Sequence, residues 1–340
     1  MSREQGPAPP LGPGLALDTA IAGMQTRPME LRSLGRYRLV RRLPGSPSRC
    51  ELFLAALEGE EEHPRHVAKL LMSGAADTEE TRRALFEHEA KILRAINHPC
   101  VPTLHAYGQQ EGVPYIVMDL VEGIDLARLL AHDTDEPRSL GKEVVVYIMG
   151  QLADALSHIH SMAELEEDES ESPVDILHRD LCPANILLSV DGDVVLADFG
   201  SATSRWLEAK YDTPGAGHTA YKAPERVTGS GEATMATELF SLAVMMWEMF
   251  KGERCFHAEN ELKTMDAIVR FDISNSRNRV TGLSSKLSEV LRRNLDRDPE
   301  RRYDSMFKML QRLAQAPEAQ AAETSRAELG ALVRSALGER

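Results

Sequence analysis

The chain has 340 residues, of which 42% are hydrophobic, so it is long enough to bury the core of one large or two ordinary domains. Its formal net charge of -14 argues against nucleic acid or an anionic membrane as the main binding partner. The four cysteines, at positions 50, 100, 182 and 255, include no CxxC pair, so their spacing indicates neither a zinc site nor a disulfide framework.

The N-terminal region has no pattern of a targeting or membrane segment. It lacks the basic and apolar regions of a signal peptide, and the apolar run at residues 239–250 is too short to span a bilayer. We therefore expect a cytoplasmic protein that binds neither membrane nor nucleic acid. Residues 1–34 begin with a Pro- and Gly-rich stretch and show little periodicity, which favours a flexible leader.

The next part of the chain alternates between strand and helix patterns. Residues 37–57 contain apolar and β-branched residues on both sides of a break at residues 44–48, which predicts two strands joined by a loop. Residues 79–95 place apolar residues among charges at helical spacing and predict a helix. Residues 97–102 indicate a turn into a strand, and the apolar segment 115–123 follows.

Four segments of the second half have patterns of their own. Residues 144–160 predict a long amphipathic helix, and the acidic residues 163–175 predict a solvated insertion, with partner docking as the alternative. Two β-branched runs, 185–190 and 194–197, flank Asp191-Gly192, which suits a tight hairpin. Five apolar residues of the tail fall on one helical face and favour a short helix that packs or docks: Leu329, Leu332, Val333, Ala336 and Leu337.

Three oxygen-bearing side chains flank the predicted hairpin. Asp180 and Asn185 lie at its start and Asp198 follows its end, so the hairpin brings all three to one place. Oxygen ligands suit Mg²⁺, which typically takes one or two carboxylates and completes its shell with substrate phosphates and water. The sequence therefore predicts a magnesium site at this end of the hairpin.

The segment that holds these side chains, residues 176–200, closely resembles the catalytic loop and Asp-Phe-Gly of eukaryotic-type (Hanks-type) serine/threonine protein kinases. The resemblance runs from residue 37 to residue 313 in the family's order. It includes His-Arg-Asp with asparagine five residues after the aspartate, Ala-Pro-Glu at 223–225, and a late Asp-Pro-x-x-Arg whose Arg302 should pair with Glu225. Small-molecule phosphotransferases of related architecture would not be expected to carry the last two motifs.

The resemblance implies an α+β fold with two lobes. A small β-rich N-lobe would cover residues 35–121, a larger and mainly helical C-lobe residues 122–313, and a tail residues 314–340. It also implies transfer of the γ-phosphoryl group of ATP, with Mg²⁺ as cofactor, to serine or threonine hydroxyls of a protein substrate. Regulatory protein partners remain open.

The family's site residues have counterparts here. Lys69 and Glu89 stand where a lysine near the phosphates is held by a glutamate. Asp180 would orient the substrate hydroxyl and accept its proton, while Asn185 and Asp198 would hold Mg²⁺. The resemblance further implies nucleotide contacts from Gly45, Val67, Lys69, Met118, Asp119, Val121, Leu187 and Asp198.

Several positions near the phosphates depart from the family pattern. Pro47 and Cys50 stand where the phosphate loop has glycines, although glycine lets the backbone approach phosphate and proline donates no N–H. Cys182 and His218 stand where serine/threonine members have lysine and threonine. Two alternatives follow: a kinase of reduced activity, or a pseudokinase that acts as a non-enzymatic scaffold.

Two hypotheses concern how such a site would be completed. A protonated His218 could replace the missing lysine, which predicts activity that rises at mildly acid pH, and a neutral loop histidine is the alternative. A phosphorylated hydroxyl of the activation segment could pair with Arg179, and the candidates are Ser201, Thr203, Ser204, Tyr211, Thr213 and Thr219.

Overall fold

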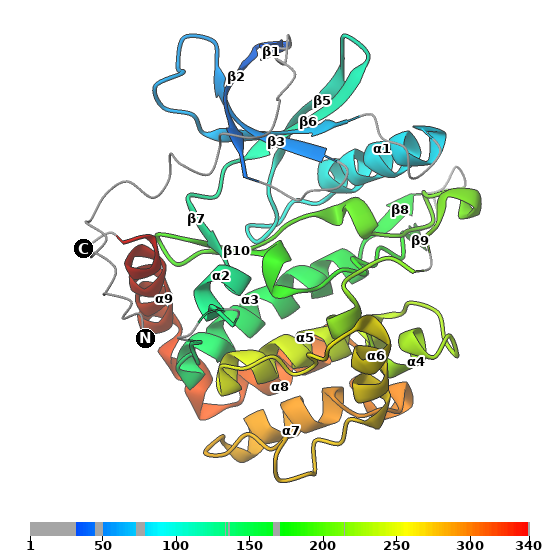
Figure 1. Ribbon diagram of the computed structural model, residues 1–340, viewed down its shortest axis with the longest axis vertical. Coiled ribbons are helices and arrows are strands. Elements are labelled where there is room, and N and C mark those ends of the chain that lie inside the picture. Colours follow the sequence, from blue (N-terminus) through cyan, green and yellow to red (C-terminus); the bar gives the residue numbers. More distant parts are fainter. Residues whose placement is uncertain are drawn as a thin grey trace, which may run out of the picture.

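The computed structural model describes residues 32–44, 50–72, 79–132, 134, 137–165, 171–213 and 215–338. Residues 1–31 of the predicted leader and the loop residues Gly45 and Pro47 lie outside this description. The described chain forms a β-rich N-terminal lobe and a larger helical C-terminal lobe (Figure 1). The predicted bilobal α+β fold is confirmed.

The N-terminal lobe is built on an antiparallel sheet. Within the described residues this sheet has six strands in the order β1-β2-β3-β4-β6-β5. β1 falls in the last residues of the predicted leader, and Leu34 packs with Tyr37 and Phe53 in a small core, so the sheet begins earlier than the sequence predicts. The strands are β1 (Ser33–Leu34), β2 (Tyr37–Leu43), β3 (Cys50–Leu57), β4 (His66–Leu71), β5 (Leu104–Gln110) and β6 (Val113–Asp119).

Helix α1 (Glu79–Ala95) has the bounds that the sequence predicts and packs on β5 and β6. Glu79 and Glu80 in its first turn and Arg94 in its last turn complement the helix dipole. Its buried face carries Glu89, and β4 carries Lys69. The packing of α1 on the sheet therefore sets the distance between the Glu89 carboxylate and the Lys69 ammonium group.

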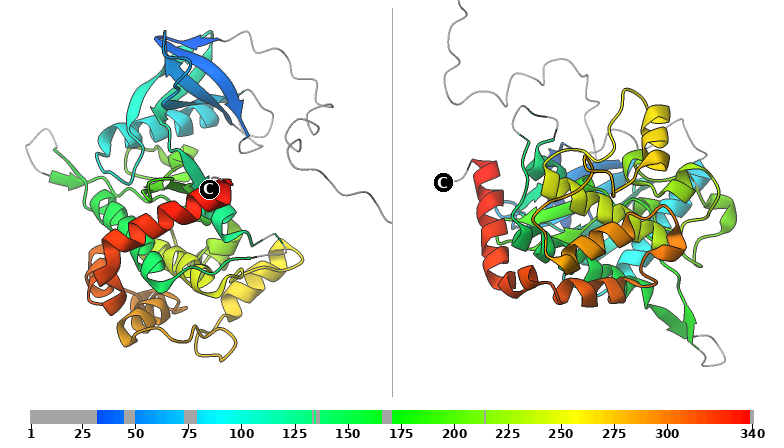
Figure 2. Two further views of the ribbon diagram at one scale, coloured as in Figure 1. Left: turned by 90° about the vertical axis from the view of Figure 1, so that its left-hand side faces the viewer. Right: turned by 90° about the horizontal axis from the view of Figure 1, so that it is seen from below.

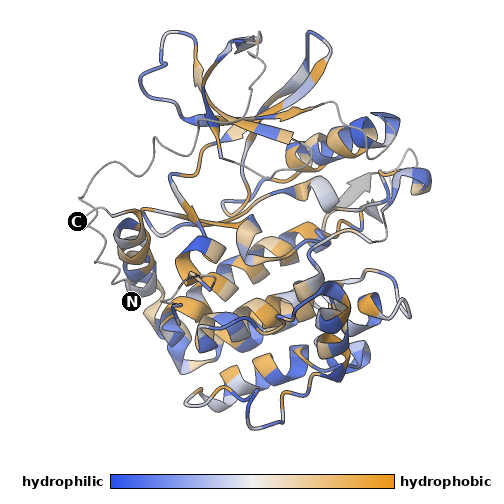
Figure 3. Cartoon of the chain, in the orientation of Figure 1, coloured by the Kyte–Doolittle hydropathy of each residue, from blue (hydrophilic) through white to orange (hydrophobic). Residues whose placement is uncertain are grey.

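The C-terminal lobe surrounds two long helices, α3 (Lys142–His160) and α5 (Met235–Lys251). Helix α5 is apolar over most of its length (Figure 3), as expected for a helix that is buried on nearly all sides. None of the described helices combines the length and the apolar character needed to cross a membrane. The other helices are α2 (Leu126–Leu130), α4 (Pro224–Val227), α6 (Glu261–Arg270), α7 (Ser285–Asn294), α8 (Met306–Ala314) and α9 (Ala322–Leu337).

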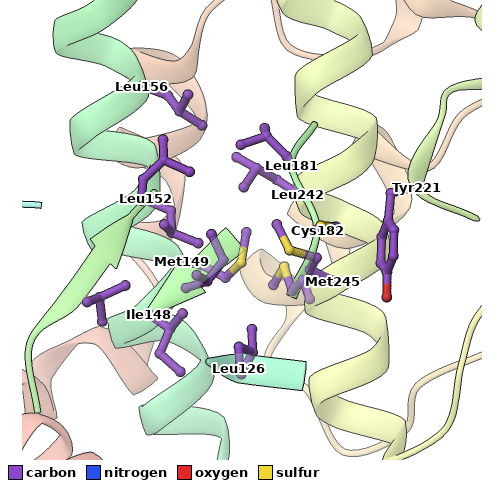
Figure 4. Packing of buried hydrophobic residues seen from close by; sticks show 14 of the residues in the cluster. Leu126, Ile148, Met149, Leu152, Leu156, Leu181, Cys182, Tyr221, Leu242 and Met245 are labelled. Atoms are coloured by element: carbon purple, nitrogen blue, oxygen red, sulfur yellow. The ribbon is translucent and has the colours of Figure 1, made fainter. Parts of the chain in front are cut away.

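The loop predicted to be catalytic is anchored in the core of this lobe. Cys182 is only 1% exposed and lies among apolar side chains of α3 and α5, such as Met149 and Met245 (Figure 4). Because protein interiors are close-packed, this contact fixes the backbone that carries Asp180 two residues earlier. The chemistry-bearing loop thus rests directly on the hydrophobic core.

The predicted hairpin is confirmed as β10 (Ile186–Ser189) and β11 (Val194–Leu196). Leu187 pairs with Val195 across the hairpin, and β10 also pairs with β7 (Gly123–Asp125), which follows the first lobe. The hairpin therefore joins the start of the C-terminal lobe to the segment after β11, where the sequence predicts the metal ligand Asp198.

The two ends of the predicted acidic insertion pair with each other. They form β8 (Ala163–Leu165) and β9 (Glu171–Pro173), a short antiparallel hairpin that projects from the lobe (Figure 2). The acidic residues 166–169 and Ser170 between them lie outside the described residues. The chain therefore leaves the lobe along β8 and returns along β9, and the two strands pair with each other.

The predicted tail helix is confirmed as α9. Leu329 and Val333 are fully buried, and the helix packs beside β7 and β10 (Figures 1 and 2). Arg326 Nη2 lies 2.6 Å from Asp193 Oδ1 of the hairpin turn. A Cβ on Gly330 would lie 2.6 Å from the carbonyl oxygen of Val190, so only glycine permits this approach. Helix α9 braces the end of the hairpin opposite to Asp180.

Candidate active site

Lys69 lies at the centre of an ion cluster that joins the two lobes. Its Nζ lies 2.7 and 2.8 Å from the two carboxylate oxygens of Glu89 and 2.8 Å from Oδ1 of Asp198. Burial opposes the charge of Lys69, but the two carboxylates outweigh it and raise its pKa. The Lys69 charge in turn lowers the pKa of Asp198 to about 2. The predicted pair is confirmed, and Asp198 completes it as a third member.

Asp198 is aimed at this cluster by the backbone after β11. The residue has φ of 64°, and its Oδ1 also accepts a hydrogen bond from the Gly200 N–H at 3.3 Å. The next side chain, Phe199, is buried and packs on the ring of His178 at 4.8 Å. Phe199 thus anchors the segment in the core while Asp198 remains 49% exposed. In the described bonds the carboxylate uses Oδ1, which leaves Oδ2 for a cation.

Asn185 lies in the turn before β10 and is held by Asp180. Its amide nitrogen donates to the Asp180 carbonyl at 2.8 Å and to Asp180 Oδ2 at 3.1 Å. Because the nitrogen is committed to these two bonds, the amide oxygen is the atom that can face a cation. An amide oxygen and a carboxylate oxygen are hard ligands, so Asn185 and Asp198 fit Mg²⁺.

Asp180 is held from its other side by His218. Oδ1 of Asp180 accepts from the backbone N–H of His218 at 2.8 Å and contacts its Nδ1 at 2.7 Å. Gly217 makes this approach possible, because it has φ of 93° and a Cβ there would lie 2.4 Å from the Arg179 carbonyl oxygen. Burial opposes the ionisation of Asp180, but the bonds from His218 outweigh it and lower the Asp180 pKa. Asp180 is therefore an ionised, oriented carboxylate.

Two of the residues that depart from the family pattern, Cys182 and His218, contact each other. Nδ1 of His218 lies 3.4 Å from Sγ of Cys182. Its hydrogen bond with Asp180 and its contact with Cys182 raise the pKa of His218 to about 10. The imidazolium therefore persists through neutral pH. This supports a charged His218 in place of the lysine, but the predicted rise of activity at mildly acid pH is wrong, because the proton is lost only at alkaline pH.

These groups line a cavity of about 510 Å³ between the lobes. Its lining includes Cys50, Lys69, Glu89, Asp180, Asp198 and His218. A larger hollow of about 910 Å³ surrounds Glu225 and Arg302 and contains none of the predicted catalytic residues. Because Lys69, Glu89 and Asp180 line the smaller cavity, the cavity between the lobes is the candidate active site.

Of the residues predicted to contact the nucleotide, Lys69 and Asp198 line this cavity and the other described ones do not. Val67 of β4 is paired with Met118 of β6, and Asp119 ends that strand. Val121 follows it, and Leu187 lies in β10. Their contact with a nucleotide stays a prediction, and that of Gly45 falls outside the described residues.

Two side-chain pairs, Arg302–Glu225 and His160–Glu238, lie next to the segments that carry the site. Arg302 Nη1 and Nη2 lie 2.6 and 2.8 Å from the Glu225 carboxylate, so the predicted pair is confirmed as a bidentate one. Glu238 accepts from the Arg179 backbone N–H at 3.0 Å and lies 2.6 Å from His160 Nε2. Sequence reasoning did not identify His160, since nothing in its spacing marks it as a partner of Glu238.

Comparisons with known proteins agree with this geometry. Residues 59–313 match the family described as protein kinase domain, and the chain belongs to this family. It is 28% identical over 275 residues to Tyrosine-protein kinase MasK of Myxococcus xanthus (strain DK1622), which covers 80% of this chain and 42% of that protein. It is 28% identical over 270 residues to Ribosomal protein S6 kinase alpha-3 of Homo sapiens, with 79% and 32% covered.

A rat relative, Ribosomal protein S6 kinase alpha-1, is 31% identical over 217 residues, which is 64% of this chain and 27% of that protein. The chain thus spans less than half the length of these curated relatives. In the structure, β2 and β3 precede residue 59 and belong to the same sheet as β4, so the folded domain extends beyond the matched range.

Proposed function

We propose that this protein is a protein serine/threonine kinase that transfers the γ-phosphoryl group of ATP to hydroxyls of a protein substrate. The observation that carries the proposal is the assembled cluster of Lys69, Glu89 and Asp198 beside the Asp180–Asn185 pair. A scaffold without catalysis does not need both a Lys69–Glu89–Asp198 ion cluster and an Asp180–Asn185 pair. We therefore favour the enzyme over the pseudokinase.

The proposed mechanism assigns one task to each side chain. Lys69, kept charged and in place by Glu89, would contact the α and β phosphates. Asn185 and Asp198 would hold Mg²⁺ through their free side-chain oxygens, and the ion would supply positive charge that neutralises the phosphates. Asp180 would orient the substrate hydroxyl and accept its proton, and the His218 imidazolium would supply the positive charge beside it.

The choice of acceptor hydroxyl, serine or threonine against tyrosine, is a separate part of the proposal. A relative bears the name tyrosine-protein kinase, while others are named S6 kinases. Labelling of a protein or peptide mixture with γ-labelled ATP, followed by phosphoamino-acid analysis, tests it. The proposal expects phosphoserine and phosphothreonine, and a product with only phosphotyrosine would contradict it.

A thermal shift with Mg-ATP separates the enzyme from the scaffold. At 100 times the dissociation constant a ligand stabilises the folded state by about 2.7 kcal/mol, so binding should be visible. We expect a shift for the native chain and a smaller one for Lys69→Met. Binding without any transfer to protein would favour the scaffold.

A further inference from the structure

Asp180, Cys182 and His218 form a cluster of three different donor atoms at the wall of the cavity between the lobes, where Asp180 and His218 line the cavity and Cys182 lies buried behind them. The Oδ1, Sγ and Nδ1 atoms all lie within 4.8 Å of one another. Nδ1 lies between the other two, at 2.7 Å from Oδ1 and 3.4 Å from Sγ. One ring nitrogen carries one proton, so it can donate to only one of these neighbours at a time. A cation at this point would engage all three.

The donor set selects the kind of cation. Thiolate sulfur, imidazole nitrogen and carboxylate oxygen bind Zn²⁺ at about 2.3, 2.0 and 2.1 Å, in a tetrahedral arrangement. Such bond lengths separate neighbouring ligand atoms by roughly 3.3 to 3.6 Å. The Sγ–Nδ1 distance already fits, and the Oδ1–Nδ1 distance must open by about 0.6 Å as the cation replaces the shared proton; the imidazole proton and the Cys182 thiol proton pass to solvent on binding. Mg²⁺ prefers oxygen ligands and belongs with Asn185 and Asp198.

The three donors are also held and reachable. Cys182 is fixed in the hydrophobic core, and Gly217 fixes the backbone that presents His218. The His218 side chain is 58% exposed, so a cation can enter from the cavity and keep a fourth position for water. The donors come from two segments 36 residues apart, which is why cysteine spacing in the sequence indicates no zinc site.

We propose that Asp180, Cys182 and His218 bind Zn²⁺ or a cation of similar chemistry, and that its binding stops phosphoryl transfer. The bound cation takes the carboxylate that receives the substrate proton and occupies the approach of the hydroxyl. The inhibitory part rests on the proposed kinase function, whereas the binding part does not.

Cobalt binding to the full chain tests the site without any assay of activity. After treatment with a chelator and its removal, Co²⁺ bound by a thiolate in a tetrahedral site gives a sulfur-to-metal charge-transfer band and visible d–d bands. We expect both in the native chain, and displacement of both by Zn²⁺. Cys182→Ser and His218→Ala should lower Co²⁺ affinity at least about 100-fold, since even outer-shell partners typically contribute 10- to 100-fold.

Cys50→Ser is the matched control, because Cys50 lines the same cavity but lies outside the cluster. It should keep the charge-transfer band, and circular dichroism should show all three variants folded. No band in the native chain would overturn the site, and a band lost in Cys50→Ser but kept in Cys182→Ser would overturn the assignment.

A second measurement tests inhibition. Phosphoryl transfer is followed with buffered free Zn²⁺ at constant Mg-ATP, and we expect loss of activity at the Zn²⁺ concentration that displaces Co²⁺. Zinc bound at the cluster with transfer unchanged or increased would overturn the inhibitory role. A chain that binds Co²⁺ as expected but shows no transfer at any Zn²⁺ concentration would refute the kinase proposal and the inhibitory role, and leave the site intact.

Discussion

Nη1 of Arg179 lies 2.6 Å from Oδ1 of Asp212, so an ion pair ties the catalytic loop to the activation segment. The Arg179 side chain is only 4% exposed, and its Nε also donates to the Ser201 carbonyl at 2.8 Å. His88 of α1 does not add charge here, because burial and the nearby Arg179 lower its pKa to about 4. The sequence predicts a phosphorylated hydroxyl as the partner of Arg179, and a carboxylate fills that role without modification.

We predict that activity does not require phosphorylation of the activation segment. Phosphatase treatment of the native chain should leave kcat/KM unchanged, while Asp212→Ala should lower it about ten-fold. A partly exposed ion pair of this kind contributes roughly 1 to 2 kcal/mol, which corresponds to that factor. Steady-state kinetics before and after phosphatase treatment measure both effects.

Glu208→Ala serves as the control, since Glu208 is an exposed residue of the same segment that pairs with Lys210. It should keep native kinetics. The prediction fails if phosphatase inactivates the native chain while Asp212→Ala remains as active as the native chain.

Substitution of glycine by alanine should have opposite effects on stability at Gly330 of α9, which contacts the hairpin, and at Gly150 of α3. Gly330→Ala should destabilise the fold, because the new Cβ would meet the Val190 carbonyl oxygen at 2.6 Å. Gly150→Ala in α3 meets nothing within 4 Å, so it should stabilise by up to about 1 kcal/mol through helix propensity. Urea unfolding measures both, and equal stabilisation by the two changes would show that α9 does not dock as described.

A buried carboxyl in α5 predicts a pH-dependent stability. Burial raises the pKa of Glu248 to about 7, although it accepts hydrogen bonds from Tyr221 Oη and the Cys255 N–H, both at 2.9 Å. His132 Nδ1 also faces it at 4.0 Å, and the charge of Arg254 acts to lower its pKa. Because the folded-state pKa lies above the usual value of 4.5, the folded state prefers the protonated form, so the stability falls as the pH rises from about 4.5 to about 7 and is constant above that range.

Glu248→Gln removes the charge, and its amide can accept from the Cys255 N–H through the oxygen while its NH2 group donates to Tyr221 Oη, because the two bonds of Glu248 use different oxygens. We expect its free energy of unfolding to match the native chain near pH 4 and to exceed it by up to about 3 kcal/mol at pH 8. The exposed Glu232→Gln should show no such pH dependence. A constant difference between native chain and Glu248→Gln across this range would contradict the assigned pKa.

The sequence predicts those parts of the fold that depend on local pattern or on motif order. Helical spacing gives α1, α3 and α9, and the Asp-Gly turn gives the β10–β11 hairpin. The pairs Lys69–Glu89 and Glu225–Arg302 follow from the order of motifs, and the structure confirms both. These features need no knowledge of how distant loops meet.

The remaining features depend on contacts between segments that have no sequence link. Cys182 and His218 look like two separate departures in the sequence, and only the fold places them 3.4 Å apart. Asp212 looks like any acidic loop residue until it meets Arg179. The pKa of His218 likewise depends on its distance from Asp180, and for that reason the pH range expected from an ordinary histidine is wrong.

The most direct test of the central claim is phosphoryl transfer from γ-labelled ATP to protein by Asp180→Asn, compared with Asp191→Asn at the opposite end of the same hairpin. Loss of a positioned general base typically costs 10²- to 10⁴-fold, so Asp180→Asn should lose transfer by about that factor while keeping the Mg-ATP thermal shift. Asp191→Asn, whose residue is exposed, should retain native transfer. Equal transfer by Asp180→Asn and the native chain, or no transfer by the native chain, would contradict this account.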